Sequence, residues 1–371
     1  MAGLRWEAGR VGSSRFHRYS NAETKWYQTG AFPVGISYRQ WVGGPTYAND
    51  IVVVHSDVCC GTGQTRRQEA RDDRALVWQR RWPLLPRVGC GGMIGDPNDW
   101  LNELENYFTP SSTEFDAAKS HRDSIEARLE SHLGIYRMFE IGSLRHGTGV
   151  WLRSDADYLV SLKGTKPQWS SSMLERVRAS LAARFPTTPI TVRRPAVVCN
   201  FSDGVVELVP GYIADTASGD PGYWIAAPGG DWMKTYPEAH NKYVNGVNTK
   251  HGGAAKQLAR LLKVWKYQRY VPVSSCYLEM RAAKHMEEQS AYIPVWDVYM
   301  VLDDLETYSL AALNDPTGLG SRFTACSSDA AKRDAMSKLN TAVGRGRKAK
   351  EYYSDGDHAG SVAQLKLLFD K

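Results

Sequence analysis

The sequence predicts an α+β protein in which a lobe built on a β-sheet precedes a lobe of helices. Two observations support this prediction. Short runs rich in β-branched and aromatic residues alternate with helical patterns between residues 96 and 215, and the apolar residues that follow recur mostly at helical spacing. Sheet elements followed by helices are typical of α+β architectures, and we expect a substrate cleft between the lobes.

Cap residues and apolar spacing define the individual elements. The first lobe is predicted to contain helices over 98–107, 112–132 and 171–185, with the second of these beginning at Ser and Thr caps and ending at Gly134. Its predicted strands are 136–141, 155–162, 190–198 and 205–209. The second lobe is predicted from helices over 249–270, 274–288, 294–310 and 328–350, with a short last helix over 362–369.

The chain divides into three parts, which are an extension over 1–92, a catalytic lobe over 93–215 and a helical lobe over 216–371. Residues 1–92 hold thirteen Lys and Arg against seven Asp and Glu, which leaves thirty-three of each in the rest of the chain. The two lobes are therefore formally neutral, and their charge does not indicate a nucleic-acid-binding surface.

The extension shows one bounded strand pattern, at 51–54, and no sustained helical periodicity. We interpret it either as an upstream segment that precedes the enzyme, with Met93 as the candidate start, or as a small accessory domain. Its cysteines lack the paired spacing of a zinc site, and the six cysteines of the chain are scattered, so no disulfide framework is predicted. We expect a cytoplasmic protein without a signal peptide or a membrane span.

Three acidic residues lie on two predicted strands in a pattern suited to nucleotidyl transfer. Asp155 and Asp157 are two positions apart, so their side chains point to the same face of the strand, and Glu207 lies on another predicted strand. Transfer brings a hydroxyl to the α-phosphate of a nucleoside triphosphate (NTP), and two divalent cations roughly 4 Å apart screen such a displacement. Because these cations prefer oxygen ligands, we predict that Asp155, Asp157 and Glu207 bind two ions of Mg²⁺ or Mn²⁺.

A Gly142-Ser143 turn follows the predicted strand over 136–141. Glycine permits close approach of the backbone to a ligand, and successive N–H groups in such a turn form an anion-binding nest to which the Ser143 hydroxyl adds a donor. The turn is therefore predicted to hold the terminal phosphates of an NTP.

Each of these features by itself is common elsewhere. An Asp-x-Asp at a strand end is more often a solvated turn, and Glu207 alone fits an exposed residue on an edge strand. The ordered set of a phosphate turn, a carboxylate pair and a third carboxylate favours catalysis, because independent features agree.

The segment 142–148, Gly-Ser-Leu-Arg-His-Gly-Thr, with Ser-Asp-Ala-Asp at 154–157, resembles the signature of polymerase-β-type nucleotidyltransferases. Leu-Leu-Lys-Val-Trp at 261–265 and Val-Ser-Ser-Cys-Tyr-Leu-Glu at 273–279 resemble the second domain shared by oligoadenylate synthases, cyclic GMP-AMP synthase and the bacterial CD-NTases. The resemblance is strongest to the bacterial CD-NTases, and Asn-Asp-Pro-Thr-Gly at 314–318 extends it towards the carboxyl end.

This resemblance implies a polymerase-β-type lobe and a helical lobe with a cleft between them. It implies a metal-dependent enzyme that joins ATP or other NTPs into a cyclic di- or trinucleotide, or a short oligonucleotide, with release of pyrophosphate. The product would signal to a downstream effector in anti-phage defence. Asp155, Asp157 and Glu207 match the family's metal-binding acids, and Ser143 matches the serine that contacts the donor triphosphate.

Two further positions follow from the resemblance. Lys263 matches a lysine that reaches the same phosphates from the second domain, and Ser275 matches a serine beside it. From the residues alone, Lys263 would be one of several lysines on a solvated helix face. Where relatives often place an aromatic ring that stacks on the donor base, this chain has Cys276, with Tyr277 next to it.

Two alternatives remain open at this point. The first is a nucleotidyltransferase that modifies RNA or protein, against which the neutral charge after Met93 argues. The second is a catalytically silent nucleotide-binding module, which would require a broken set of acids, whereas the set here is intact.

Overall fold

The computed structural model describes residues 6–11, 14–21, 23–31, 37–42, 95–111, 116–151, 153, 155–215 and 219–371. The chain forms two compact units, Met1–Arg87 and Val88–Lys371. In the described part of the chain, no helix is both long enough and apolar enough to cross a bilayer.

The first unit contains an antiparallel sheet of four strands, where the sequence predicts no strand before residue 51. The strands are β1 (Trp6–Val11), β2 (Ser14–Asn21), β3 (Glu23–Ala31) and β4 (Ser37–Val42), in the order β1-β2-β3-β4. Aromatic residues occur in each of them, and Tyr27 on β3 is opposite Trp41 on β4. The sequence prediction missed these strands because arginines and other polar residues interrupt the apolar pattern. The strand predicted at 51–54 lies outside the described residues.

The second unit contains a mixed sheet of seven strands. They are β5 (Ile135–Glu140), β6 (Ala156–Leu162), β7 (Ile190–Arg193), β8 (Ala196–Asn200), β9 (Val205–Asp215), β10 (Gly222–Ala226) and β11 (Trp232–Thr235). The main order is β11-β10-β9-β6-β5, and the β7–β8 hairpin joins through β8 to β9. Strands β6 and β9 are parallel, whereas every other pair in this sheet is antiparallel.

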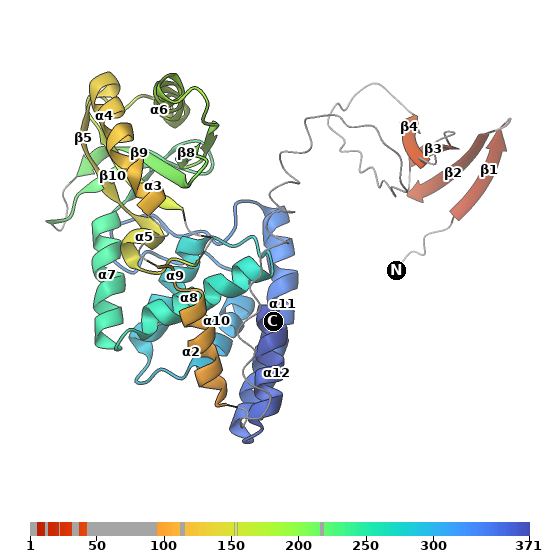
Figure 1. Cartoon of the computed structure of the whole chain (residues 1–371). Helices are drawn as coiled ribbons and strands as arrows, with labels where there is room; N and C mark the ends of the chain where they lie inside the picture. Colours follow the sequence, from red (N-terminus) through yellow and green to blue (C-terminus); the bar gives the residue numbers. More distant parts are fainter. Residues whose placement is uncertain are drawn as a thin grey trace. The chain divides into compact units, whose positions relative to one another are not determined.

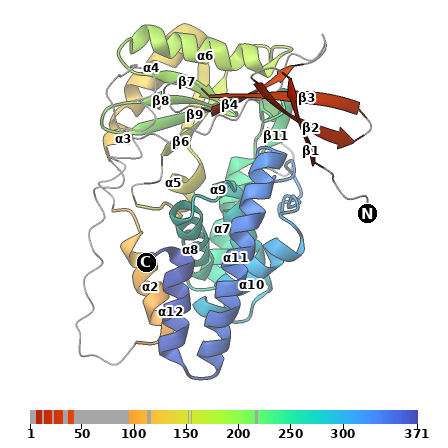
Figure 2. The same cartoon turned by 90° about the vertical axis from the view of Figure 1, so that its right-hand side faces the viewer.

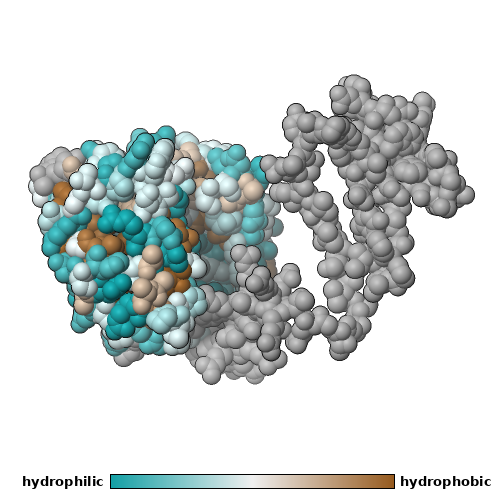
Figure 3. All heavy atoms as spheres, turned by 90° about the horizontal axis from the view of Figure 1, so that it is seen from above, coloured by the Kyte–Doolittle hydropathy of each residue, from teal (hydrophilic) through white to brown (hydrophobic). Residues whose placement is uncertain are grey.

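Two helices, α4 (Arg122–Leu133) and α6 (Ser170–Arg184), cover one face of this sheet (Figures 1 and 2). The short helix α5 (Gly142–His146) lies on the side of the helical lobe. A still shorter helix, α3 (Asp116–Ser120), precedes α4. Figure 3, which looks down on this lobe, shows a mostly hydrophilic surface with scattered apolar patches. Because α5 lies on the side of the helical lobe, the sheet face towards α5 is the one that meets that lobe.

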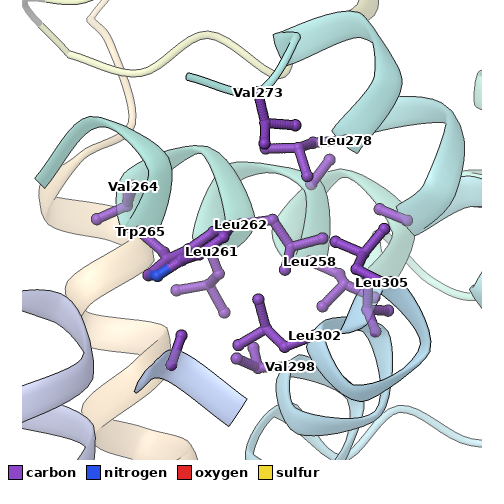
Figure 4. Packing of buried hydrophobic residues seen from close by; sticks show 14 of the residues in the cluster. Leu258, Leu261, Leu262, Val264, Trp265, Val273, Leu278, Val298, Leu302 and Leu305 are labelled. Atoms are coloured by element: carbon purple, nitrogen blue, oxygen red, sulfur yellow. The ribbon is translucent and has the colours of Figure 1, made fainter. Parts of the chain in front are cut away.

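The helical lobe is built around one buried helix, α8 (Ala254–Gln268). Its neighbours are α2 (Pro97–Tyr107), α7 (Pro237–Lys250), α9 (Ser275–Glu288), α10 (Pro294–Thr307), α11 (Asp329–Ser354) and α12 (His358–Phe369). Leu258, Leu261, Leu262 and Trp265 of α8 are almost fully buried, and Leu258 and Leu262 lie close to Leu302 of α10 (Figure 4). Because α8 is apolar on several sides, it forms the core on which the other helices pack.

The α+β prediction is confirmed, but several boundaries are wrong. The helix predicted over 112–132 is divided into α3 and α4, and α4 ends at Gly134, which adopts a φ of +71°. The strand predicted over 190–198 is the β7–β8 hairpin, because Pro195 cannot continue a strand ladder at that point. The helix predicted over 249–270 is divided between α7 and α8 by Gly252 and Gly253, both of which have positive φ.

The boundary between the lobes also differs from the prediction at 215/216. Strands β10 and β11 continue the sheet to Thr235, past that boundary. Helix α2, predicted within the catalytic lobe, contributes Leu101 and Leu104 to the core of the helical lobe. The helical lobe therefore begins with a helix that precedes the sheet in the sequence.

Candidate active site

Asp157 and Glu207 lie side by side on the parallel strands β6 and β9, where they are register partners. Their strand neighbours point to the opposite face, since Ala156, Tyr158, Val206 and Leu208 belong to the core under α4 and α6. Asp157 and Glu207 therefore share the face towards the helical lobe. The sequence predicted both residues, and the parallel pairing brings them together.

Asp155 lies just before β6 and is contacted by an arginine that the sequence analysis did not single out. Arg193, at the end of β7, forms ion pairs with Glu207 and, at 3.7 Å, with Asp155. Its side chain is 64% exposed, whereas that of Glu207 is 14% exposed. The β7–β8 hairpin thus places a largely exposed cation beside Asp155 and Glu207. In the strand register, Arg193 is opposite Ala196 and Val198 is opposite Glu207, so the arginine lies on the same sheet face as the acids. This placement could not be predicted without knowing that β7 and β8 form a hairpin.

The surroundings of Asp157 perturb the acidity of its carboxyl group. Burial, followed by repulsion from Asp155 and from Glu279, raises its pKa to about 7. Two neighbouring carboxylates resist simultaneous ionisation unless a cation compensates them. This is the electrostatic state expected of acids that await a positively charged ligand.

The Gly142 turn packs directly against Asp157. Gly142 has a φ of +62°, and a Cβ atom at this position would lie 2.5 Å from Oδ2 of Asp157. The backbone of the preceding residue also contacts Asp157, since the N–H of Ile141 donates to the carbonyl oxygen of Asp157 at 2.9 Å. Only glycine allows both the positive φ and the close approach to Asp157 at this position. Ser143 follows Gly142 in the first turn of α5.

Ser275, at the start of α9, contacts a lysine other than the predicted one. Nζ of Lys266 donates to Oγ of Ser275 at 2.6 Å, and the Tyr267 hydroxyl lies 3.2 Å from the same oxygen. Burial and then repulsion from Lys263 lower the pKa of Lys266 to about 8, and the charges of Arg193 and Asp155 also act on it. Lys266 therefore faces the region of the acids.

Lys263 differs from the prediction that it reaches phosphates. Its side chain is 1% exposed, and Nζ donates to Oε1 of Glu279 at 2.7 Å and to the carbonyl oxygen of Thr148 at 2.8 Å. These partners hold the ammonium group inside the protein. The sequence could have indicated Lys266 as well, because the two lysines are three positions apart and so lie on one face of the helix.

This chain has Cys276 at the position where the family resemblance leads us to expect an aromatic ring. Cys276 is exposed in the first turn of α9. The adjacent Tyr277 is fully buried, and its hydroxyl donates to the carbonyl oxygen of Ala311 at 2.8 Å. Tyr277 therefore belongs to the helical core and does not supply a stacking surface for a base.

The carboxylates have the donor chemistry of a magnesium or manganese site. All three offer oxygen atoms as ligands, Asp157 and Glu207 are adjacent, and burial followed by repulsion from neighbouring carboxylates raises the pKa of Asp157. Among the described residues, no three acidic, His or Cys side chains converge closely enough to enclose an ion as they stand. The cation that contacts Asp155 and Glu207 is the Arg193 guanidinium. The residue types fit divalent cations, provided that Arg193 moves aside.

Comparisons with known proteins agree with this geometry. Residues 96–248 match the family described as the Second Messenger Oligonucleotide or Dinucleotide Synthetase (SMODS) domain. A "Cyclic AMP-AMP-AMP synthase" of Acinetobacter sp. (strain ATCC 27244 / 9458) is 25% identical over 265 residues, which are 65% of this chain and 76% of the relative. A "Probable cyclic nucleotide synthase" of Bacillus cereus (strain VD146) is 29% identical over 131 residues, which are 34% of this chain and only 40% of the relative.

A solved structure of E. coli MS115-1 CdnC with ATP shares the fold. It superimposes with a TM-score of 0.60 at 16% identity, and the match covers 75% of this chain and 99% of CdnC. The matched family model begins at the cap of α2 and ends within α7, so it contains the acids and the Gly142 turn. Sequence signature, domain match and fold thus agree: residues 96–248 match the SMODS family, and the chain has the fold of the bacterial CD-NTases, with a polymerase-β-type catalytic lobe.

Proposed function

We propose that this protein joins NTPs into a cyclic di- or trinucleotide, or a short oligonucleotide, with release of pyrophosphate. The observation that carries the proposal is the pairing of Asp157 with Glu207 on adjacent parallel strands, with the Gly142 turn packed against Asp157. This arrangement provides oxygen ligands and a phosphate-binding turn on one sheet face. The curated relatives named as cyclic nucleotide synthases support the class of product.

The donor NTP would be held by groups from both lobes. The Ser143 hydroxyl and the N–H groups of its turn suit the terminal phosphates from the catalytic lobe. Lys266 and Ser275, which already contact each other, suit the same phosphates from the helical lobe. A lysine supplies a point charge and a serine supplies a hydroxyl donor, so this pair would recognise triphosphate without selecting a base.

Asp155, Asp157 and Glu207 would hold the divalent cations. When bound, two Mg²⁺ or Mn²⁺ ions polarise the α-phosphate and lower the pKa of the attacking hydroxyl. The protein residues would orient the reactants: Gly142 keeps the turn against Asp157, and Arg193 would have to release Glu207 for that carboxylate to bind a cation. Each transfer forms a bond from a ribose hydroxyl oxygen to the α-phosphorus and breaks the bond from that phosphorus to pyrophosphate, while the hydroxyl proton is released.

A cyclic product requires a further transfer within one bound chain. The last 5′-triphosphate must meet a ribose hydroxyl of the same oligonucleotide, so the same acids would act at every step. The description of the matched family supports a second messenger as the product. We further propose that a downstream effector senses this product in anti-phage defence.

Incubation with labelled NTPs tests the proposal. The four NTPs are supplied singly and in mixtures with Mg²⁺ or Mn²⁺, and the products are treated with phosphatase before separation. We expect phosphatase-resistant products from the wild-type protein and none from Asp155→Ala/Asp157→Ala. Transfer of label only to added RNA or protein would favour a different nucleotidyltransferase, and absence of any transfer would contradict the proposal.

A further inference from the structure

A buried polar network joins the two lobes below the proposed phosphate site. Its centre is Glu279 on α9, which is 2% exposed. Its carboxylate accepts hydrogen bonds from Nζ of Lys263 at 2.7 Å and from the Thr148 hydroxyl at 2.6 Å, and its other oxygen lies 3.0 Å from Nδ1 of His146. Lys263 belongs to the helical lobe, whereas His146 and Thr148 belong to the segment that follows the Ser143 turn.

The same segment is held at its backbone by a second buried cation. Arg260, one turn before Lys263 on α8, donates to the carbonyl oxygens of Gly147 at 2.8 Å and Gly149 at 2.9 Å. It also forms an ion pair with Glu105 of α2. Residues 146–149 are thus fixed to the helical lobe through both side chains and backbone.

This segment is continuous with the turn that carries Ser143. The N–H of Thr148 donates to the carbonyl oxygen of Ser143 at 3.1 Å. On the other side, Glu279 lies one helical turn after Ser275, and Lys263 lies one turn before Lys266. The Lys263–Glu279 pair is therefore the inner of two bridges between α8 and α9, and the outer bridge is Lys266–Ser275.

Such a network is costly to bury, and packing alone does not explain it. Removing a carboxylate and an ammonium group from water carries a desolvation cost that an apolar pair of similar volume would avoid. Here the surroundings hold Glu279 as a carboxylate, since attraction by Lys263 and hydrogen bonding by His146 lower its pKa against the effect of burial. A buried ion pair that forms despite this desolvation cost, as Lys263–Glu279 does, is suited to holding its neighbours in one geometry.

We propose that Glu279, together with Lys263, is a positioning residue that sets the Ser143 turn against the Lys266–Ser275 pair. The donor triphosphate would then meet both sets of groups at once. The inference rests on the proposed function, because it assumes that these groups bind the donor. Lys263 acts in this account through Glu279 and Thr148, without touching the nucleotide.

The test separates charge from packing with the double variant Glu279→Gln/Lys263→Met. It removes both charges together and leaves neither buried without a partner, so its thermal stability should equal or exceed that of the wild type. Loss of the Glu279 carboxylate removes the charged partner of the His146 ring and of the Thr148 hydroxyl. We expect the Kd for a non-hydrolysable analogue of each NTP to rise about tenfold, because misplacing a binding group by a fraction of an ångström weakens simultaneous contacts.

A matched control removes a different buried pair. His285 and Asp297 lie in the helical lobe, 2.7 Å apart, and the hydrogen bonds of Asp297 go to its own lobe. The variant His285→Gln/Asp297→Asn should bind the analogues as the wild type does. If weakening follows any change in buried charge, both double variants will show it, which would overturn the positioning role.

Binding by Lys266→Ala distinguishes failure of this inference from failure of the proposed function. If Lys266→Ala binds the analogues like the wild type, the assignment of the phosphate site is wrong. If Lys266→Ala binds weakly while a folded Glu279→Gln/Lys263→Met protein binds normally, only the positioning role is wrong. Should the double variant not fold, Thr148→Val decides: it removes one hydrogen bond to Glu279, and unchanged analogue binding at wild-type stability would contradict the inference.

Discussion

Asp157 of β6 and Glu207 of β9 are register partners across the parallel strand pair of the sheet. Residues that are 50 positions apart in the sequence thus become neighbours on one sheet face. The Gly142 turn closes on Asp157 from the adjoining strand β5. This relationship places two of the three acids and the phosphate turn in one place, and the following predictions depend on it.

Removing either acid should abolish turnover. We expect Asp157→Asn and Glu207→Gln to lower the rate by about 10²-fold or more, since stabilisation of transition-state charge by bound ions supplies much of the catalysis. Divalent-ion affinity, measured by calorimetry, should fall in parallel. Asp203→Asn is the matched control, because Asp203 is an exposed acid just before β9 that pairs with His121. Wild-type turnover in either acid variant would disprove the site.

Much of this site could be predicted from the sequence because strand alternation and turn chemistry are local. Asp155 and Asp157 were placed on one face by their spacing, and Gly142 by its place after a strand. The pairing of Glu207 with Asp157 depends on strand order, which local patterns do not determine. The resemblance to the CD-NTases supplied that information, because it matches Glu207 with one of the family's metal-binding acids.

Lys266→Ala should weaken the use of every NTP to a similar degree. Because the ammonium group would act on phosphates, we expect KM to rise about tenfold with unchanged base preference. Ser275→Ala should act in the same direction but less strongly, since it removes a neutral donor. Lys250→Ala, on the exposed end of α7, serves as the control in the same steady-state assay. An effect confined to one nucleotide would place Lys266 near a base.

The affinity for NTPs should depend on pH through Lys266. Its pKa is lowered to about 8, so the ammonium group that attracts phosphate is lost as the pH rises through that value. We expect analogue binding to weaken between about pH 7 and pH 9 in the wild type. Lys266→Arg should bind with a flatter profile over this range, because a guanidinium group stays protonated. Identical profiles for the two proteins would exclude Lys266 as the titrating group.

Arg193→Gln should tighten the binding of divalent ions. In the metal-free protein, Arg193 neutralises Glu207 and Asp155, and an entering ion must displace it. Because the Arg193 side chain is 64% exposed, water screens its ion pairs and they contribute about 1 kcal/mol, so we expect a gain in Mn²⁺ affinity of about fivefold. The melting temperature in EDTA should fall slightly, as the acids lose their counter-ion. Weaker Mn²⁺ binding by Arg193→Gln would show that the arginine supports the metal site.

The errors of the sequence prediction have a common physical origin. Lys263 and Lys266 carry the same charge on the same helix face, and Lys263 is the one whose ammonium group is held inside by Glu279 and the Thr148 carbonyl oxygen. Strands β10 and β11 were missed because they have only five and four residues, and because β11 contains Lys234. The place of Arg193 depends on the β7–β8 hairpin, whereas the sequence analysis predicts one strand over 190–198. In each case a tertiary contact overrides the local pattern.

The stoichiometry of pyrophosphate release tests the central claim most directly. Purified protein is incubated with the NTPs that it consumes, and pyrophosphate is measured together with the mass of the product. A cyclic product requires one pyrophosphate for each nucleotide incorporated and a mass equal to a whole number of nucleoside monophosphate residues, and this is the predicted result. A ratio below one with a product that keeps its 5′-triphosphate would indicate a linear oligonucleotide, and no pyrophosphate at all would contradict nucleotidyl transfer by this site.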